Sequence, residues 1–177
     1  MSRARNLISL FGEEHTNALV QYKLAEPIAN QVRKLRSMLS KDDLDSNEDE
    51  AQDLDPHVTI FYGLQDEDLS DVKECLKYFG TAGFTIKSKP TIFDNPKHDV
   101  LILPVESSCF GQLNKHIRNW CGKEPPTYRE YHPHCTIAYL KKGIPYKHLS
   151  LPKDYQGTTD EVEFSDTNDN SHRIQLR

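Results

Sequence analysis

The chain has 177 residues, a formal net charge of −5 at pH 7 and a pI near 5.9. This length fits a single domain over residues 1–177 with a sizeable core. No apolar run approaches the ~18 residues of a membrane helix, and no signal-peptide core follows the basic N-terminus, so we expect a cytoplasmic protein without a membrane partner. The acidic balance argues against long nucleic acid as a partner and favours a small substrate with few phosphates.

The first 55 residues are predicted to contain one strand, one helix and two irregular segments. Proline is favoured in the first turn of a helix, so Pro27 indicates where the helix opens. A stretch rich in Asp and Glu is predicted to be a solvated loop. In chain order these are an N-terminal lead (1–17), a strand (18–24), a helix (26–39) and an acidic loop (41–55).

One pattern then occurs twice. The sequence Pro-His-x-Thr-Ile-x-Tyr spans residues 56–62 and recurs at residues 133–139. The copies are too short and too far apart for a solenoid repeat. They indicate two related lobes, each of which contributes one histidine and one threonine to a shared site.

Each copy is predicted to be a strand, and alternate side chains on a strand point to opposite faces. His57 therefore shares a face with Thr59, and His134 shares a face with Thr136. The remaining positions are apolar enough to form a core face: Val58, Ile60, Tyr62, Cys135, Ile137 and Tyr139.

The rest of the chain supplies further helices and strands. Trp120 is expected to anchor the second of these helices in the core. After the first motif come a helix (68–79) and two strands (84–93 and 100–105). The next helix is capped by Ser107 and Ser108 and contains Phe110, Leu113, Ile117 and Trp120. A loop (122–131), the second motif strand and two closing strands (162–164 and 173–176) complete the chain. This order predicts an α+β fold of two antiparallel sheets with helices outside.

The two His/Thr pairs suggest phosphodiester chemistry without a metal. Two imidazoles can supply a general base and a general acid, because the unperturbed pKa of histidine is near ~6.5. Two threonine hydroxyls can donate hydrogen bonds to phosphate oxygens. The alternative is that the two lobes are related but chemically silent.

Other residues are candidates for binding the substrate. Phe61 shares the predicted face of His57 and is either a base-stacking residue or packing between lobes. Arg129, on the loop before the second motif, either binds a phosphate or is solvated. His132 is placed at the rim of the site. A His132/His134 metal pair lacks accompanying ligands, so no metal and no cofactor is predicted.

The four cysteines are scattered and form no Cys-x-x-Cys pair. They are predicted to be reduced, mostly buried thiols rather than a disulfide framework or a zinc site. Cys135 follows His134 but points to the opposite strand face, so a covalent cysteine mechanism is not expected.

In these motifs the chain resembles the 2H phosphoesterase superfamily, which is named for two His-x-Thr/Ser motifs. Its members include the bacterial LigT-like RNA 2′,3′-cyclic phosphodiesterases and eukaryotic 2′-5′ oligonucleotide phosphodiesterases. The resemblance runs from Leu19 to the C-terminus. The sequence of residues 131–140 is most similar to that of small 2H proteins carried by phages, such as the anti-CBASS nuclease that destroys cyclic-nucleotide signals.

The resemblance implies a bilobal 2H phosphoesterase-like fold with a central cleft that holds both motifs. It implies metal-independent catalysis at a nucleotide phosphate by four residues: His57, Thr59, His134 and Thr136. It also makes Tyr22 a base-stacking candidate, although alternation with Val20 and Leu24 favours a core position.

The leading hypothesis is a phosphodiesterase for a small cyclic nucleotide or cyclic oligonucleotide. Such an enzyme would suit a phage protein that degrades host immune signals in the host cytoplasm. The alternatives are an RNA-end 2′,3′-cyclic phosphodiesterase, a 2′-5′ RNA ligase-like enzyme, a non-catalytic nucleotide sponge and a structural module. The sequence leaves open the nucleophile, the assignment of acid and base, and the oligomeric state.

Overall fold

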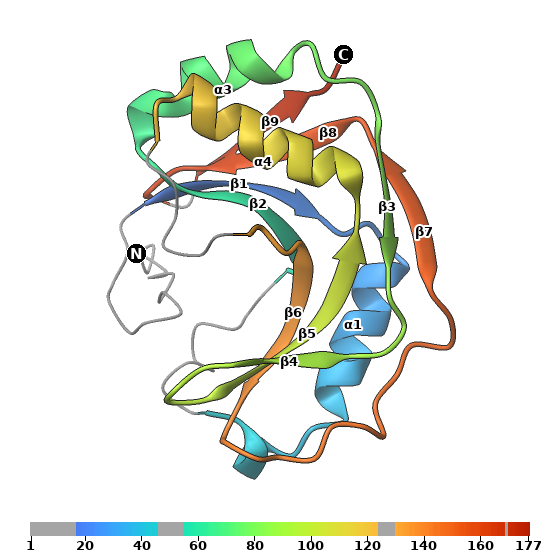
Figure 1. The fold of residues 1–177 in the computed structure, drawn as a ribbon. Helices are drawn as coiled ribbons and strands as arrows, with labels where there is room; N and C mark the ends of the chain where they lie inside the picture. The colour runs from blue at the N-terminus through green and yellow to red at the C-terminus, as the bar shows by residue number, and fades with distance from the viewer. Residues whose placement is uncertain (1–16, 46–54, 124–129, 169) are drawn as a thin grey trace.

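The two motif strands, β2 (His57–Leu64) and β6 (His134–Leu140), lie side by side at the centre of a curled antiparallel sheet (Figure 1). The sheet has nine strands in the order β7-β3-β5-β6-β2-β1-β8-β9, and β4 pairs with β5. The other strands are β1 (Ala18–Lys23), β3 (Ala82–Ile86), β4 (Thr91–Asp94), β5 (Asp99–Glu106), β7 (Tyr155–Thr159), β8 (Glu161–Ser165) and β9 (Ser171–Gln175). This computed structural model describes residues 17–45, 55–123, 130–168 and 170–177.

Helices cover the outer side of the curled sheet (Figure 1). They are α1 (Ile28–Ser37), α3 (Leu69–Leu76) and α4 (Ser108–Trp120), with short 3-10 turns η1 (Lys41–Asp43) and η2 (Asp66–Asp68). The Ser107 hydroxyl caps α4 by accepting from the Phe110 backbone N–H, as the sequence predicted. The core lies between the helices and the sheet. It includes Val58 and Ile60 of β2 with Cys135 and Ile137 of β6, the positions that alternation assigned to the core face.

The α+β class is confirmed, but the expectation of two separate sheets is wrong. Val58 of β2 pairs with Cys135 of β6, and this contact joins the two halves into one sheet. The strand predicted over residues 84–93 is in fact two strands, β3 and β4, which pair with opposite ends of β5. Pro90 lies between them and cannot donate a ladder hydrogen bond, which accounts for the interruption.

Strand β7 was not predicted, because its sequence Tyr-Gln-Gly-Thr-Thr has no apolar alternation. It pairs with β3, and Gly157 lies opposite Phe84. A Cβ on Gly157 would lie 2.5 Å from Cζ of the Phe84 ring, so only glycine fits beneath this ring.

Trp120 is not the expected core anchor. It is 48% exposed at the last position of α4, where the helix runs beyond the core, and its ring lies 5.9 Å from that of His116. The buried positions of α4 are Phe110, Leu113, Asn114 and Ile117.

The start of the predicted acidic loop packs against the sheet. Leu44 forms a bridge with Leu140, and the Asp45 N–H donates to the Tyr139 carbonyl at 3.0 Å. Residues 46–54 of that loop and the lead residues 1–16 lie outside the described part of the chain. Within the described part, no helix is long and apolar enough to cross a membrane.

Candidate active site

The register of β2 and β6 relates the two motifs by a local twofold symmetry. Val58 pairs with Cys135 in antiparallel register. Continuing this register by one residue in each direction places His57 beside Thr136 and Thr59 beside His134. The result is two cross-strand His/Thr couples on one side of the sheet, opposite the core. We call this side the site face.

Both motif histidines are anchored in the same way. Nδ1 of His57 lies 3.0 Å from the carbonyl of Asp55, and Nδ1 of His134 lies 2.7 Å from the carbonyl of His132. A carbonyl oxygen can only accept, so each Nδ1 carries the hydrogen and donates it. Nε2 is therefore the atom through which each neutral imidazole can accept a proton, or each imidazolium can donate one.

The surroundings favour the neutral form of both rings. Burial lowers the pKa of His57 below the ordinary value, and the positive charge of Lys23 lowers it further. Burial also lowers the pKa of His134, with a smaller contribution from the nearby His57. The two rings are therefore near enough for a charge on His57 to affect the pKa of His134.

Each motif strand has a bulge directly after its threonine. Consecutive β1 residues Val20 and Gln21 face Phe61 and Thr59, so β2 has one extra residue at Ile60. In β6 the extra residue is Ile137, because Leu101 and Ile102 face Ala138 and Thr136. A bulge reverses the alternation beyond it, so the two residues after each bulge change faces: Phe61 and Tyr62 in β2, and Ala138 and Tyr139 in β6.

The bulges overturn three face predictions. Phe61 does not share the face of His57; it pairs with Val20, belongs to the core and is 7% exposed. Tyr62 and Tyr139 were predicted to be core residues, yet both are only half-buried on the site face. Each motif therefore presents a histidine, a threonine and a tyrosine on the same side.

Side chains from the outer layer bind the carbonyl groups that the bulges free. The Tyr131 hydroxyl donates to the Thr59 carbonyl at 2.8 Å. Nδ2 of Asn114 on α4 donates to the Ile60 carbonyl at 2.7 Å. At the equivalent place in β6, Nη1 of Arg36 on α1 lies 3.4 Å from the Ile137 carbonyl. None of these three hydrogen bonds was predicted from the sequence.

Of the other predicted binding residues that the structure describes, Tyr22 lies in the core and His132 is exposed beside the second motif. Tyr22 is 8% exposed and packs 5.0 Å from Phe84 and 6.0 Å from Phe110, in the core position that alternation favoured. The His132 side chain is 66% exposed, and its backbone carbonyl anchors His134. Arg129 lies outside the described residues.

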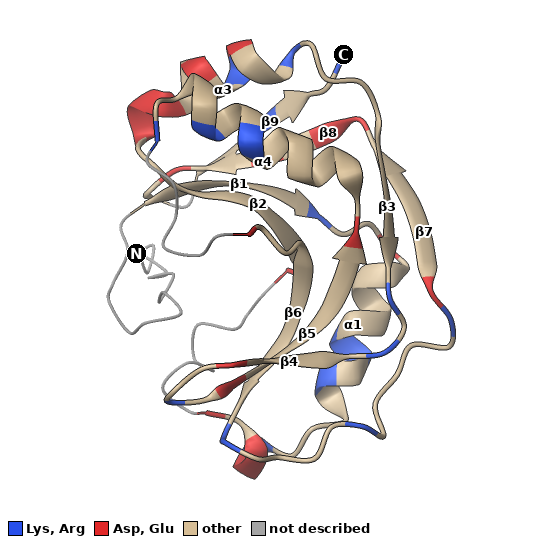
Figure 2. Cartoon of the chain, in the orientation of Figure 1, with Lys and Arg blue, Asp and Glu red and all other residues tan. Residues whose placement is uncertain are grey.

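Residues that flank the motifs were missed as site residues. Lys23 is the register partner of His57 on β1, and its Nζ lies 3.0 Å from Oε1 of Glu163 on β8. On the opposite side, the ring of Phe93 lies edge-on to His134, with centroids 4.8 Å apart. β2 and β6 contain no Lys, Arg, Asp or Glu (Figure 2). The charged side chains beside the motifs therefore come from neighbouring strands, as Lys23 and Glu163 do.

The two buried cysteines, Cys75 and Cys135, are poor nucleophiles. All four cysteines are free, and burial raises the pKa of Cys75 and of Cys135 to about 12. Among the described residues, no three His, Cys, Asp or Glu side chains are grouped to hold a metal ion.

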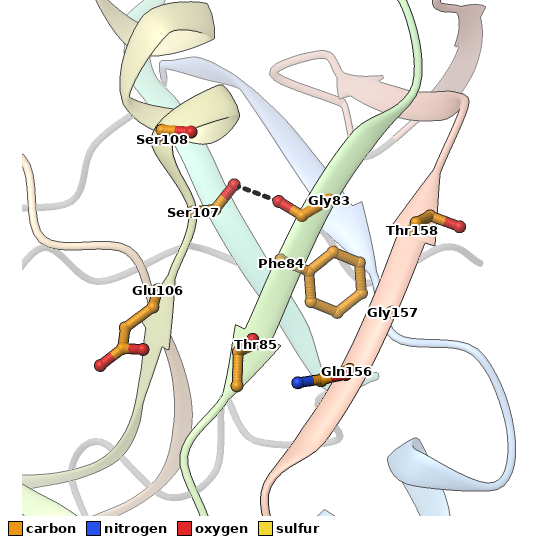
Figure 3. Close-up of a pocket in the computed structure, with 9 residues that line it drawn as sticks. All are labelled: Gly83, Phe84, Thr85, Glu106, Ser107, Ser108, Gln156, Gly157 and Thr158. Carbon is orange, nitrogen blue, oxygen red and sulfur yellow. Dashed lines mark hydrogen bonds between the residues drawn. The ribbon is translucent and has the colours of Figure 1, made fainter.

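An open hollow of about 630 Å³ lies elsewhere, between β3, β7 and the start of α4 (Figure 3). The Phe84 ring lies over Gly157 there, and the Ser107 hydroxyl donates to the Gly83 carbonyl at 2.7 Å. None of the four motif residues lines this hollow.

Known proteins share this fold. The crystal structure of TT0787 of Thermus thermophilus matches with a TM-score of 0.66 at 13% identity, over 91% of this chain and 98% of that one. E. coli LigT complexed with NADP+ matches with a TM-score of 0.56 at 16% identity, over 91% and 95%. The MHV ns2 PDE domain matches with a TM-score of 0.50 at 18% identity, over 84% and 98%.

At the level of sequence, no curated protein matches. Residues 24–167, however, match the family described as the 2'-5' RNA ligase superfamily. This match includes both His-x-Thr motifs and most of the chain. The protein therefore belongs to the 2'-5' RNA ligase superfamily, the group of LigT-like 2H phosphoesterases.

Proposed function

We propose that this protein is a phosphodiesterase that cleaves small nucleotides by two-histidine general acid–base catalysis. The observation that carries the proposal is the twofold-related pair of His/Thr couples with matched anchors. Both Nδ1 atoms donate to a carbonyl two residues earlier in the chain. Within the described part of the chain, neither Nε2 atom and neither threonine hydroxyl has a hydrogen-bond partner, so these four groups are available to a phosphate.

The proposed step needs no metal, because the two imidazoles account for both proton transfers. The nucleophile, water or a ribose hydroxyl, attacks phosphorus and gives its proton to Nε2 of one histidine. The bond from phosphorus to the leaving oxygen breaks, and that oxygen takes a proton from Nε2 of the other histidine. Thr59 and Thr136 donate to the non-bridging oxygens as negative charge grows there.

The substrate proposed is a cyclic nucleotide or cyclic oligonucleotide. A small nucleotide is supported by the net charge of −5 and by structures of E. coli LigT with NADP+, 3'-AMP and ATP. The resemblance of the second motif's sequence to phage 2H proteins supports a cyclic oligonucleotide signal as the substrate. The second candidate is an RNA 2′,3′-cyclic end or a 2′-5′ linkage, and the family description supports the 2′-5′ linkage. Of the residues predicted to contact the substrate, His132 and Arg129 remain candidates.

Turnover in EDTA tests the proposal. The substrates would be 2′,3′-cyclic mononucleotides, cyclic di- and trinucleotides and a 2′-5′ dinucleotide, with products separated by chromatography. We expect His57→Ala and His134→Ala each to lower kcat by about 10²- to 10⁴-fold, because each removes one proton-transfer group. The member that is cleaved identifies the substrate class.

Two controls make this test specific. His148→Ala replaces a histidine outside the motifs and should leave the rate unchanged. Circular dichroism should show that all variants remain folded. Near wild-type rates in both motif variants would refute the proposed mechanism. Binding of a substrate without cleavage would instead indicate a nucleotide sponge.

A further inference from the structure

The symmetry of the site ends one strand away from the motifs, and the β1 side is polar. Lys23 is the register partner of His57, and Gln21 is the register partner of Thr59. Oε1 of Glu163 lies 3.1 Å from Nε2 of Gln21 and 3.0 Å from Nζ of Lys23. We call Lys23, Gln21 and Glu163 the polar flank. It suits the ribose and phosphate part of a ligand.

The equivalent positions on the β5 side are apolar. Pro104 is the register partner of His134, and Ile102 is the register partner of Thr136. Beyond β5, the edge strand β4 contributes Phe93. We call Pro104, Ile102 and Phe93 the apolar flank. The two flanks differ in chemistry although the catalytic groups between them are related by symmetry.

Phe93 lies on the site face and is open to a ligand. It is the register partner of Val100, which pairs with Tyr139 on the site face. Its side chain is half-buried. Its ring is inclined at 87° to that of His134. Among the described residues, it is the aromatic side chain with a ring contact to a motif histidine.

Holding His134 in place does not account for this aromatic. His134 is already fixed by its Nδ1 bond to the His132 carbonyl. His57 has the same kind of anchor and pairs with Lys23 rather than an aromatic. Since one motif histidine is positioned without an aromatic neighbour, the aromatic at the other points to an additional role.

We propose that Phe93 is a nucleobase platform, so that the base of a substrate lies on the His134 side and the rest of the substrate extends past His57 toward the polar flank. The inference rests on the proposed function and adds a direction to the bound nucleotide. Every nucleobase has a π-face that can stack on an aromatic ring, and loss of one stacking ring typically weakens binding about 5- to 100-fold.

The test compares adenosine 2′,3′-cyclic phosphate with its base-free analogue, 1,4-anhydroribitol 2,3-cyclic phosphate, by calorimetric binding. Every protein in the comparison, including the wild-type Phe93 reference, carries His57→Ala so that neither ligand is cleaved. We expect wild type to prefer the nucleotide about 5- to 100-fold. Phe93→Ala and Phe93→Leu should abolish this preference and bind the base-free analogue as wild type does. Phe93→Trp should retain it. Trp120→Ala, which removes an exposed aromatic elsewhere, is the matched control and should bind as wild type.

Three results would overturn the inference: no preference in wild type, a preference that survives Phe93→Ala, or an equal loss for both ligands. The third would assign Phe93 to the support of His134. Thermal unfolding of each variant separates these results from loss of fold. A base preference that depends on Phe93 in a protein that cleaves no substrate would refute the proposed function but not the platform.

Discussion

At the scale of single residues, the site is defined by which nitrogen of each imidazole is occupied. Two backbone carbonyls take the Nδ1 hydrogens, so Nε2 is left for chemistry in both rings. The proposed reaction requires one neutral ring and one protonated ring at the same time. Burial lowers the pKa of both, which makes the protonated partner the scarce species at neutral pH.

This arrangement predicts a pH–rate profile of kcat/KM whose falling alkaline limb begins below the ordinary histidine pKa of ~6.5. The limb reports loss of the proton from the acid in the free enzyme. The kcat profile should lie at higher pH, because a bound phosphate anion favours the imidazolium. Both profiles would be measured with a diester that does not titrate between about pH 4 and about pH 9. An alkaline limb of kcat/KM well above the ordinary histidine range would contradict the prediction.

The pH–rate profile of a Lys23→Gln variant tests which histidine is the general acid and which is the general base. Lys23 lowers the pKa of His57, so removing its charge raises that pKa and moves one limb to higher pH. Where the acid has the higher pKa of the two histidines, a moving alkaline limb makes His57 the acid, and a moving acidic limb makes it the base. Lys77→Gln, after the end of α3, is the control that should move neither limb.

At the scale of secondary-structure elements, sequence periodicity predicted the motif strands and the core positions before each bulge. Its prediction of side-chain faces failed after Thr59 and Thr136. The extra residue of a bulge reverses the alternation, and no change in residue type at that position reveals it. For the same reason Phe61 was placed on the wrong face, and Tyr62 and Tyr139 were placed in the core. Tertiary hydrogen bonds such as that from Asn114 to Ile60 lie between residues far apart in the chain, so no local pattern announces them.

Asn114→Ala should test how far the bulge of β2 depends on α4. The change leaves the buried Ile60 carbonyl without its donor, which typically costs about 1–3 kcal/mol in the free energy of unfolding. Because Ile60 follows Thr59, we also expect a lower kcat with a smaller change in KM. Urea unfolding and steady-state kinetics measure the two effects. Asn119→Ala, at an exposed position of the same helix, should change neither, and an equally silent Asn114→Ala would show that the bulge holds without this bond.

At the scale of the whole molecule, one sheet carries both motifs, and the halves meet where Val58 pairs with Cys135. The sequence indicated two related lobes, but pairing between strands 77 positions apart (His57 to His134) is not encoded locally. The same limit applies to the flanks. Lys23 lies on β1, far along the chain from the second motif, and Phe93 lies on β4, far along the chain from the first motif. Only the order of strands in the sheet brings these two residues to the site face.

The charge of the whole molecule predicts that a longer nucleic-acid substrate has no higher kcat/KM than a short one. The net charge is −5, the motif strands are uncharged, and Lys23 is already paired with Glu163. A protein with about 6–10 phosphate contacts loses roughly 10³- to 10⁵-fold in affinity between about 50 and 200 mM salt. We therefore expect kcat/KM to agree within about threefold for a dinucleotide and a strand of about 20 nucleotides that share one 2′,3′-cyclic end, with a shallow salt dependence for both. A long strand favoured at low salt and lost steeply at high salt would instead reveal an extended nucleic-acid track, and would move the substrate from small nucleotides to RNA ends.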